Sequence, residues 1–205
     1  MSKKLKYRLK ALFLIFFYLG FCSKLQAKVS YQLNPFIGFQ LFGQTSIYEA
    51  KEEYTLRATD ITLGLRLGLH LEKFKVGFEY FGGVEKSTRY DFVDQWGKST
   101  FGVFGSFPYE KWALRTTVYL SSSKTLTSDG NAGPGNEGEF AQGRGAGLGL
   151  DYQWYPHLLL SYDYRHLSYD TIGDKELVPS NYSELENKEY VFGLSYLFNF
   201  ESNLF

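Results

Sequence analysis

The chain has 205 residues, of which 44% are hydrophobic and 19% are aromatic, and its 22 basic and 22 acidic residues give a net charge of zero. Cys22 is the only cysteine, which excludes a disulfide framework. The 17 Tyr, 19 Phe and 21 Gly residues favour an all-β barrel or sandwich.

Residues 1–27 have the features of a secretory signal peptide. A basic start that runs from Lys3 to Lys10 precedes an apolar run over residues 11–21, and a short polar stretch ends at Ala27. The apolar run is short for a membrane-spanning helix. The alternatives are a retained anchor helix and a lipoprotein site at Cys22, which the bulky Phe21 disfavours.

Cleavage after Ala27 would leave one domain, residues 28–205, that is acidic. Six of the 22 basic residues and none of the 22 acidic residues lie in residues 1–27, so the mature chain has 16 basic and 22 acidic residues. The resulting net charge of −6 argues against nucleic acid as a partner. The mature chain also lacks a cysteine and therefore a thiol nucleophile.

Eight segments of the mature chain alternate with period 2, which is typical of β-strands with two different faces. In residues 61–71 every odd position is Ile or Leu, whereas the even positions include Arg66 and His70. Pro35 cannot donate a backbone hydrogen bond and is expected to mark the start of the first strand. The predicted strands are 36–45, 61–71, 74–81, 101–107, 112–120, 146–154, 158–165 and 190–200.

The connections alternate between short and long. Residues 72–73, 108–111 and 155–157 are short turns, and the long connections are 46–54, 82–98, 121–143 and 169–188. This alternation predicts an up-and-down barrel with both termini at the turn end. In outer-membrane barrels the turns face the periplasm and the loops face outside.

The charges of the predicted strands fall on one face, the face that also carries most of the strand glycines. An eight-stranded barrel has an interior only just wide enough for side chains, so we expect this face to point inward and the leucines to face lipid. The sequence therefore predicts an all-β, eight-stranded antiparallel up-and-down transmembrane β-barrel. The inward charges are Arg66, Lys75, Glu79, Arg115, Asp151, Asp163 and Arg165, together with His70.

Strand length and aromatic placement agree with a membrane barrel. Residues 61–71 are long enough to cross a bilayer at about 45° of tilt. Trp112, Trp154 and Phe74 lie beside the short turns, and Tyr80 and Tyr164 lie nearer the loops, as two aromatic girdles would. The soluble alternative is a secreted lipocalin-like barrel, which would need a polar exterior and an apolar cavity.

The inward charges are expected to pair, because an unpaired buried ion is costly. If residues 72–73 form a two-residue hairpin, Arg66 stands opposite Glu79. The functional interpretation of such a network is a gate or proton path. The structural interpretation, which we favour, is a salt-bridged plug that specifies the fold.

One stretch suggests catalysis. His166 and Ser168 share the lipid-facing side of a strand, and this arrangement resembles outer-membrane lipid A 3-O-deacylases, which use a His/Ser/Glu triad. Glu184 or Glu186 could supply the acid. Tyr169 replaces the Asn that follows the Ser in that family, and the alternative interpretation is an interfacial His beside a loop Ser.

No cofactor or metal site is indicated. The sequence has only three histidines, at positions 70, 157 and 166, and lacks a His-Glu-x-x-His motif. We therefore expect neither zinc nor another cofactor.

Two short motifs carry a resemblance to a known family. Gly193, Tyr196 and Phe198 in "GLSYLF" resemble the C-terminal signal that the barrel-assembly machinery reads. "SYDYRHLSYD" (161–170) resembles the penultimate-strand motif of the OmpA/OmpX-like family of small outer-membrane barrels, with His166 in place of a Tyr.

The resemblance implies a barrel in the outer membrane of a Gram-negative bacterium, exported through the periplasm. It implies contact with outer-membrane lipids and lipopolysaccharide, insertion by the barrel-assembly machinery and an extracellular ligand at the loops. It implies no single activity. We expect a non-enzymatic role as a structural element, a surface-interaction protein or a small-solute conduit, with the deacylase as the alternative.

Overall fold

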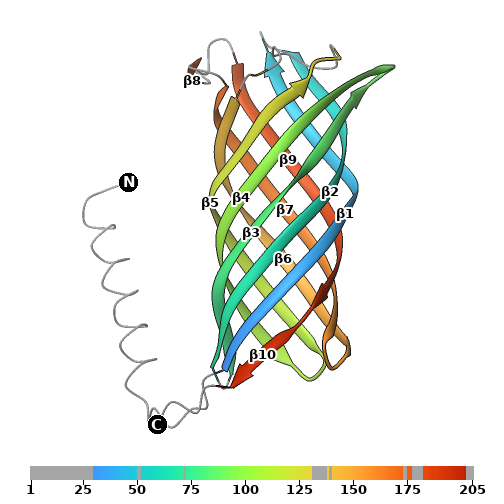
Figure 1. The fold of residues 1–205 in the computed structure, drawn as a ribbon. Helices are drawn as coiled ribbons and strands as arrows, with labels where there is room; N and C mark the ends of the chain where they lie inside the picture. Colours follow the sequence, from blue (N-terminus) through green and yellow to red (C-terminus); the bar gives the residue numbers. More distant parts are fainter. Residues whose placement is uncertain are drawn as a thin grey trace, which may run out of the picture.

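In the computed structural model, the chain forms an antiparallel barrel with tilted strands (Figure 1). The structure describes residues 30–49, 52–71, 73–130, 138, 140–172, 175–176 and 182–201, and the predicted signal peptide lies outside the described residues. The strands are β1 (Ser30–Glu49), β2 (Glu52–Leu71), β3 (Phe74–Arg89), β4 (Phe92–Tyr109), β5 (Trp112–Ser128), β6 (Phe140–Tyr155), β7 (Leu158–Ile172), β8 (Lys175–Glu176), β9 (Tyr182–Tyr196) and β10 (Phe198–Glu201).

Eight long strands make up the wall, and the first and last of them close it. Strands β1 to β7 pair in chain order, and β9 pairs with both β7 and β1. β10 continues the last strand along β1, and β8 adds two residues beside β7. This topology confirms the predicted fold class. Within the described residues, the structure contains no helix of the length and apolar character needed to cross a membrane.

The strands extend beyond the predicted ends, so the prediction of long connections at 46–54 and 82–98 is wrong. The other two connections stay long but are shorter than predicted, because β5 ends at Ser128 before β6 starts at Phe140, and β7 ends at Ile172 before β9 starts at Tyr182. The predicted connection 82–98 is a continuous hairpin in which β3 runs to Arg89, Tyr90 and Asp91 form the turn, and β4 starts at Phe92. This hairpin projects at the loop end of the barrel (Figure 1). The sequence pattern does not show this extension, because the outward positions Gly82, Val84, Lys86 and Thr88 of β3 mix apolar, polar and glycine residues. They give no regular hydrophobic contrast with the inward Glu85 and Ser87.

The prediction that Pro35 starts the first strand is also wrong, because β1 begins at Ser30. Pro35 pairs with Leu65 on the β2 side. On the other side it falls between the Leu33–Phe198 and Phe36–Ser195 pairs, at the break between β9 and β10. The ladder is thus interrupted where the proline has no N–H to donate. The same break divides the predicted last strand, 190–200.

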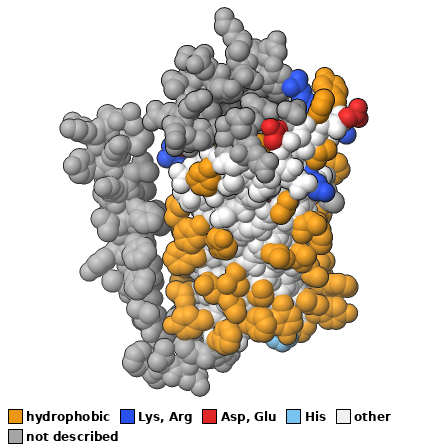
Figure 2. Space-filling view, turned by 45° about the horizontal axis from the view of Figure 1, so that its top comes forward, with side chains coloured by type: hydrophobic (Ala, Val, Ile, Leu, Met, Phe, Trp, Pro, Cys, Tyr) orange, Lys and Arg blue, Asp and Glu red, His pale blue; other side chains and the backbone are white. Residues whose placement is uncertain are grey.

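The outside of the barrel carries an apolar belt next to the turn end. Leu67, Leu114 and Leu148 are each about half exposed there, and Trp112 and Trp154 lie exposed beside the turns. Figure 2 shows hydrophobic side chains over the lower wall and charged side chains only near the upper end. A soluble barrel would have the opposite exterior, so the outside of this barrel is that of a membrane protein.

Above the belt the wall continues as a polar collar, which we define by its outward-facing residues. They are the upper-strand side chains Thr55, Arg57, Thr59, Lys86, Gln142, Arg144, His166, Ser168, Glu186 and Lys188.

The inside of the barrel is packed with large side chains of both kinds. Phe81, Leu167 and Tyr169 are almost completely buried, and so are Arg115 and Arg165. The apolar side chains form a core cluster that runs through the middle and upper parts of the interior. Because this core is shared with charges, the interior has to satisfy those charges with ion pairs.

Candidate functional site

The candidate site is a network of ion pairs inside the barrel, in two layers. The lower layer consists of Arg66, Arg115, Glu79, Asp151 and Asp163. The side chains of Arg66, Arg115, Glu79 and Asp163 are at most 4% exposed, and that of Asp151 is 13% exposed. These side chains come from β2, β3, β5, β6 and β7, and each lies an even number of residues from other inward-facing residues of its strand, which places it on the inner face.

Arg115 is the centre of the lower layer. Its Nε and Nη2 donate to the two carboxylate oxygens of Asp151, both at 3.2 Å. Nη1 donates to Glu79 Oε2 at 3.0 Å, and Nη2 also donates to Asp163 Oδ1 at 2.5 Å. Arg66 donates to the same Glu79 oxygen and, at 3.1 Å, to Asp163 Oδ2. Two guanidinium groups thus share three carboxylates, in the bidentate and bridging geometry that Arg favours.

The upper layer consists of Lys98, Lys124, Asp60, Glu85 and Glu189. Lys98 contacts Asp60 and lies 2.8 Å from Glu189 Oε1 and 3.8 Å from Glu85 Oε2. Lys124 lies 2.6 Å from Glu85 Oε1. Asp60 and Glu85 are direct cross-strand partners, and Lys98 offsets the repulsion between these like charges. Asn187 adds a hydrogen bond to Glu85 at 2.9 Å.

Aromatic rings and Arg165 fill the space between the two layers. The Arg165 guanidinium stacks 4.0 Å above the Phe81 ring, and it lies within ion-pair distance of both Asp163 and Glu189. Tyr119 packs edge-on against Phe81 and donates its hydroxyl to Glu79 at 3.3 Å. These side chains are almost completely buried, and together they close the middle of the barrel to solvent.

The structure brings together six of the seven predicted inward charges. The register pairs Arg66 directly with Glu79, as the two-residue hairpin predicts. Arg115, Asp151, Asp163 and Arg165 join the same network. Lys75 points inward but stands apart at the turn end, beside its cross-strand neighbour His70.

The upper layer was not predicted from the sequence. Four of its members lie an even number of residues from the predicted inward residues of their strands: Asp60, Glu85, Lys98 and Glu189. Continuing the predicted inward–outward alternation beyond the predicted strand ends would therefore place them inside. Lys124 is different, because a β-bulge in β5 places Leu120 and Ser121 both outward and shifts the phase by one residue. Simple alternation would place Lys124 outside.

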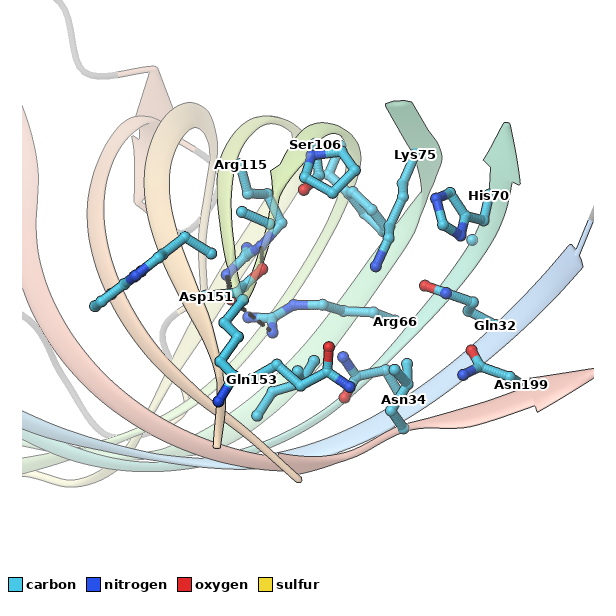
Figure 3. A pocket seen from close by; sticks show the side chains of 18 of the residues that line it. Gln32, Asn34, Arg66, His70, Lys75, Ser106, Arg115, Asp151, Gln153 and Asn199 are labelled. Carbon is cyan, nitrogen blue, oxygen red and sulfur yellow. Dashed lines mark hydrogen bonds and ion pairs between the residues drawn. The ribbon is translucent and has the colours of Figure 1, made fainter. Parts of the chain in front are cut away.

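Below the lower layer, a polar pocket of about 370 Å³ opens at the turn end. Arg66, Arg115 and Asp151 lie at its inner end, and Lys75 and His70 point into it from β3 and β2 (Figure 3). Gln32, Asn34, Ser106 and Asn199 add polar groups to its walls.

His166 and Ser168 face outward in the polar collar. His166 Nε2 lies 3.4 Å from Glu186 Oε2, which in turn is 3.7 Å from Lys188 Nζ. In the described part of the chain no hydrogen bond joins Ser168 to His166. Glu184 lies in β9, but its side chain is outside the described part of the structure. The deacylase interpretation therefore gains a carboxylate neighbour for the His but no nucleophile–base contact.

The residues of the predicted assembly signal lie on either side of the β9–β10 break. Tyr196 and Phe198 face outward with their ring centroids 4.6 Å apart. Gly193 faces inward, where a Cβ atom would lie 2.3 Å from Ser161 Oγ. Leu197, between Tyr196 and Phe198 in the sequence, turns inward, and its N–H donates to the carbonyl of His157 at 2.8 Å.

No three His, Cys, Asp or Glu side chains in the described part of the chain are arranged to hold a metal ion.

Comparison with known proteins gives a likeness of fold. No protein-family model matches the sequence, and no curated protein sequence matches it. Ail, the attachment invasion locus protein of Yersinia pestis, solved in complex with the heparin analogue sucrose octasulfate, matches with a TM-score of 0.50 and 11% identity over 82% of this chain and 99% of its own.

Two further solved structures give similar values. Neisserial surface protein A (NspA) matches with a TM-score of 0.49 and 11% identity, over 82% of this chain and 96% of its own. The outer membrane protein OprG from Pseudomonas aeruginosa matches with a TM-score of 0.45 and 14% identity, over 86% of this chain and 97% of its own. The chain thus has the fold of the small eight-stranded outer-membrane β-barrels.

Proposed function

We propose that this chain is an integral protein of a Gram-negative outer membrane, and that it is a sealed barrel which acts as a structural element and through its polar collar and loops. The apolar belt supports the location, because such a surface requires lipid around it. In this orientation the turn end faces the periplasm and the collar faces outside, next to lipopolysaccharide.

The closed interior is the observation that carries the proposal. A conduit needs a continuous polar path past Arg66 and Glu79. Instead, the ion pairs and the rings of Phe81 and Tyr119 occupy the cross-section, and the turn-end pocket ends at Arg66 and Arg115. Opening a path would separate several buried ion pairs at once, and each separation costs several kcal/mol.

Conductance in planar bilayers tests the proposal. We expect the refolded chain to insert without producing stepwise currents, because the plug is held by ion pairs on all sides. Insertion is checked by the heat-dependent shift in electrophoretic mobility that folded barrels show.

Discrete channel openings would contradict the sealed barrel, provided that Arg115→Ala changes their size. A current that is unaffected by this substitution would come from an impurity or from leakage around the barrel, and the experiment would be repeated with repurified protein.

The collar and the loops are the parts through which we propose that the protein contacts other molecules. The collar carries Arg144, Lys188 and Glu186 on its outer face, so it presents both signs of charge at the lipid headgroup level. Insertion by the barrel-assembly machinery, with Gly193, Tyr196 and Phe198 as part of the signal, is included in this proposal.

A further inference from the structure

The turn-end pocket contains more positive than negative charge. Its lining includes Arg66, Lys75, Lys111 and Arg115 as basic residues and Glu110 and Asp151 as acidic residues. Asp151 is already engaged, because Arg115 donates to both of its carboxylate oxygens at 3.2 Å. Glu110 lies exposed in the turn at the mouth. Arg66 and Arg115 are also engaged, with Glu79 and Asp163 of the lower layer, so among the described residues the basic group of the lining that has no ion pair inside the pocket is Lys75.

Hydrogen-bond donors without partners face this space. Arg66 is 3% exposed, yet its Nη1 makes no hydrogen bond and lies 3.9 Å from Asp151 Oδ1. Within the described residues Lys75 Nζ has neither a hydrogen bond nor an ion pair within 4 Å, although the charge of Asp151 acts on it, and it points into the pocket (Figure 3). A buried or half-buried donor without a partner costs free energy unless a ligand or water satisfies it.

Neutral polar groups complete the arrangement. The side chain of Asn34 is 7% exposed, and its Oδ1 also lacks a partner. Rotation of the amide by 180° presents its NH₂ group to the pocket instead. Asn199 supplies a further donor from β10, the neighbour of the strand that carries Asn34, and Ser106 supplies one from β4. The volume of about 370 Å³ is within the usual range for small-molecule sites.

We propose that this pocket binds a small phosphate-bearing anion, with Lys75 and Arg66 as its cationic partners and the amide and hydroxyl groups as additional donors. Lys75 and an unused Arg N–H suit a tetrahedral oxyanion, because each of its oxygens accepts charge-assisted hydrogen bonds. Free inorganic phosphate and the terminal phosphate of a monoester share this chemistry. Binding in this pocket does not require a path through the barrel, so it can occur whether or not the barrel conducts.

Isothermal titration of the refolded full chain in zwitterionic detergent tests this site. The probes are inorganic phosphate and glycerol 3-phosphate, with glycerol as the neutral control. We expect Lys75→Met to weaken binding of the phosphate probe by about tenfold, since one charge-assisted hydrogen bond contributes about 1.5 kcal/mol. Lys86→Met, the same substitution on the outer face of β3, is expected to leave the affinity unchanged.

Lys75→Arg keeps the charge, so we expect it to retain binding, which separates loss of charge from loss of folding. Raising the salt concentration should weaken binding in the wild type. Binding of glycerol 3-phosphate alone would identify a monoester as the ligand, and binding of both probes would identify phosphate itself. No binding of either probe, equal affinity in Lys75→Met, or equal binding of glycerol would overturn the proposal.

Discussion

Glu79 is the carboxylate on which the lower layer of the network depends. It accepts hydrogen bonds from Arg66, Arg115 and Tyr119, and its side chain is fully buried. Loss of its charge would remove the buried carboxylate oxygen to which both Arg66 and Arg115 donate, and would weaken the ion pairs of both guanidinium groups. A buried ion pair that loses one partner is more costly than an ion pair that was never present.

We therefore expect Glu79→Gln to lower the free energy of unfolding by about 3 kcal/mol. Urea-induced unfolding in lipid vesicles, followed by tryptophan fluorescence, measures this change.

Two further substitutions calibrate the effect of Glu79→Gln. Tyr119→Phe removes one hydrogen bond and is expected to cost about 1 kcal/mol. Glu186→Gln, in the partly exposed pair with His166 and Lys188, is expected to cost less than about 1 kcal/mol. Equal losses for Glu79→Gln and Glu186→Gln would show that the interior network does not stabilise the barrel.

At some glycines of the strands, the backbone of the neighbouring strand lies so close that a Cβ atom would clash with it. Gly77 of β3 lies directly opposite Gly68 of β2. A Cβ atom on Gly77 would lie 2.0 Å from the carbonyl oxygen of Leu67, which is a backbone atom and cannot move aside cheaply. At Gly105 of β4 the nearest atom to a Cβ, Thr116 Oγ1, is 3.9 Å away.

We expect Gly77→Ala to destabilise the barrel by about 1–3 kcal/mol, the usual range for an overpacked position. Gly105→Ala should be nearly neutral. The fraction of chain that refolds into vesicles at increasing urea concentrations compares the two variants. A Gly105→Ala variant as unstable as Gly77→Ala would mean that strand propensity, and not the close approach, sets the cost.

The lower half of each strand could be predicted from the sequence, and the upper half could not, for a physical reason. Inside the membrane the two faces of a strand meet lipid and a polar interior, so aliphatic residues such as Leu63 and Leu67 alternate with Gly64 and Arg66. Above the membrane both faces are polar, as with Glu85 and Lys86, and the alternation carries no hydrophobic contrast.

The candidate site was predictable to the same extent. Arg66 and Glu79 follow from one hairpin register, because a two-residue turn fixes every pair in β2 and β3. The inward position of Lys124 depends on the bulge in β5. The sequence around Leu120 and Ser121 contains no signal that predicts this bulge. Only the three-dimensional pairing assigns that lysine to the interior.

At the scale of the whole molecule, the belt and the collar define how the barrel sits in a bilayer. Cys22 is the only cysteine in the sequence and lies in the predicted signal peptide, so a cysteine introduced into the barrel would be the single cysteine of the mature chain and can report on one level of the wall. Thr55 and Leu67 both face outward on β2, one in the collar and one in the belt. Lys73 lies exposed in a turn at the other end.

In intact cells, we expect a membrane-impermeant maleimide to label Thr55→Cys but neither Leu67→Cys nor Lys73→Cys. Permeabilising the outer membrane should expose Lys73→Cys and leave Leu67→Cys unlabelled, because lipid covers the belt. Gel shift of the labelled protein measures each reaction. Labelling of Lys73→Cys in intact cells would show that the orientation is reversed.

The break at Pro35 has a consequence for the barrel before it closes. Hairpin partners such as Leu71 and Phe74 are near neighbours in sequence, whereas Phe36 and Ser195 come from opposite ends of the chain, so the β1–β9 contact is expected to form last. Until then β1 is a free sheet edge, to which a second chain could pair. A proline on that edge removes one donor and shortens the continuous template, which protects the nascent protein against edge-to-edge aggregation.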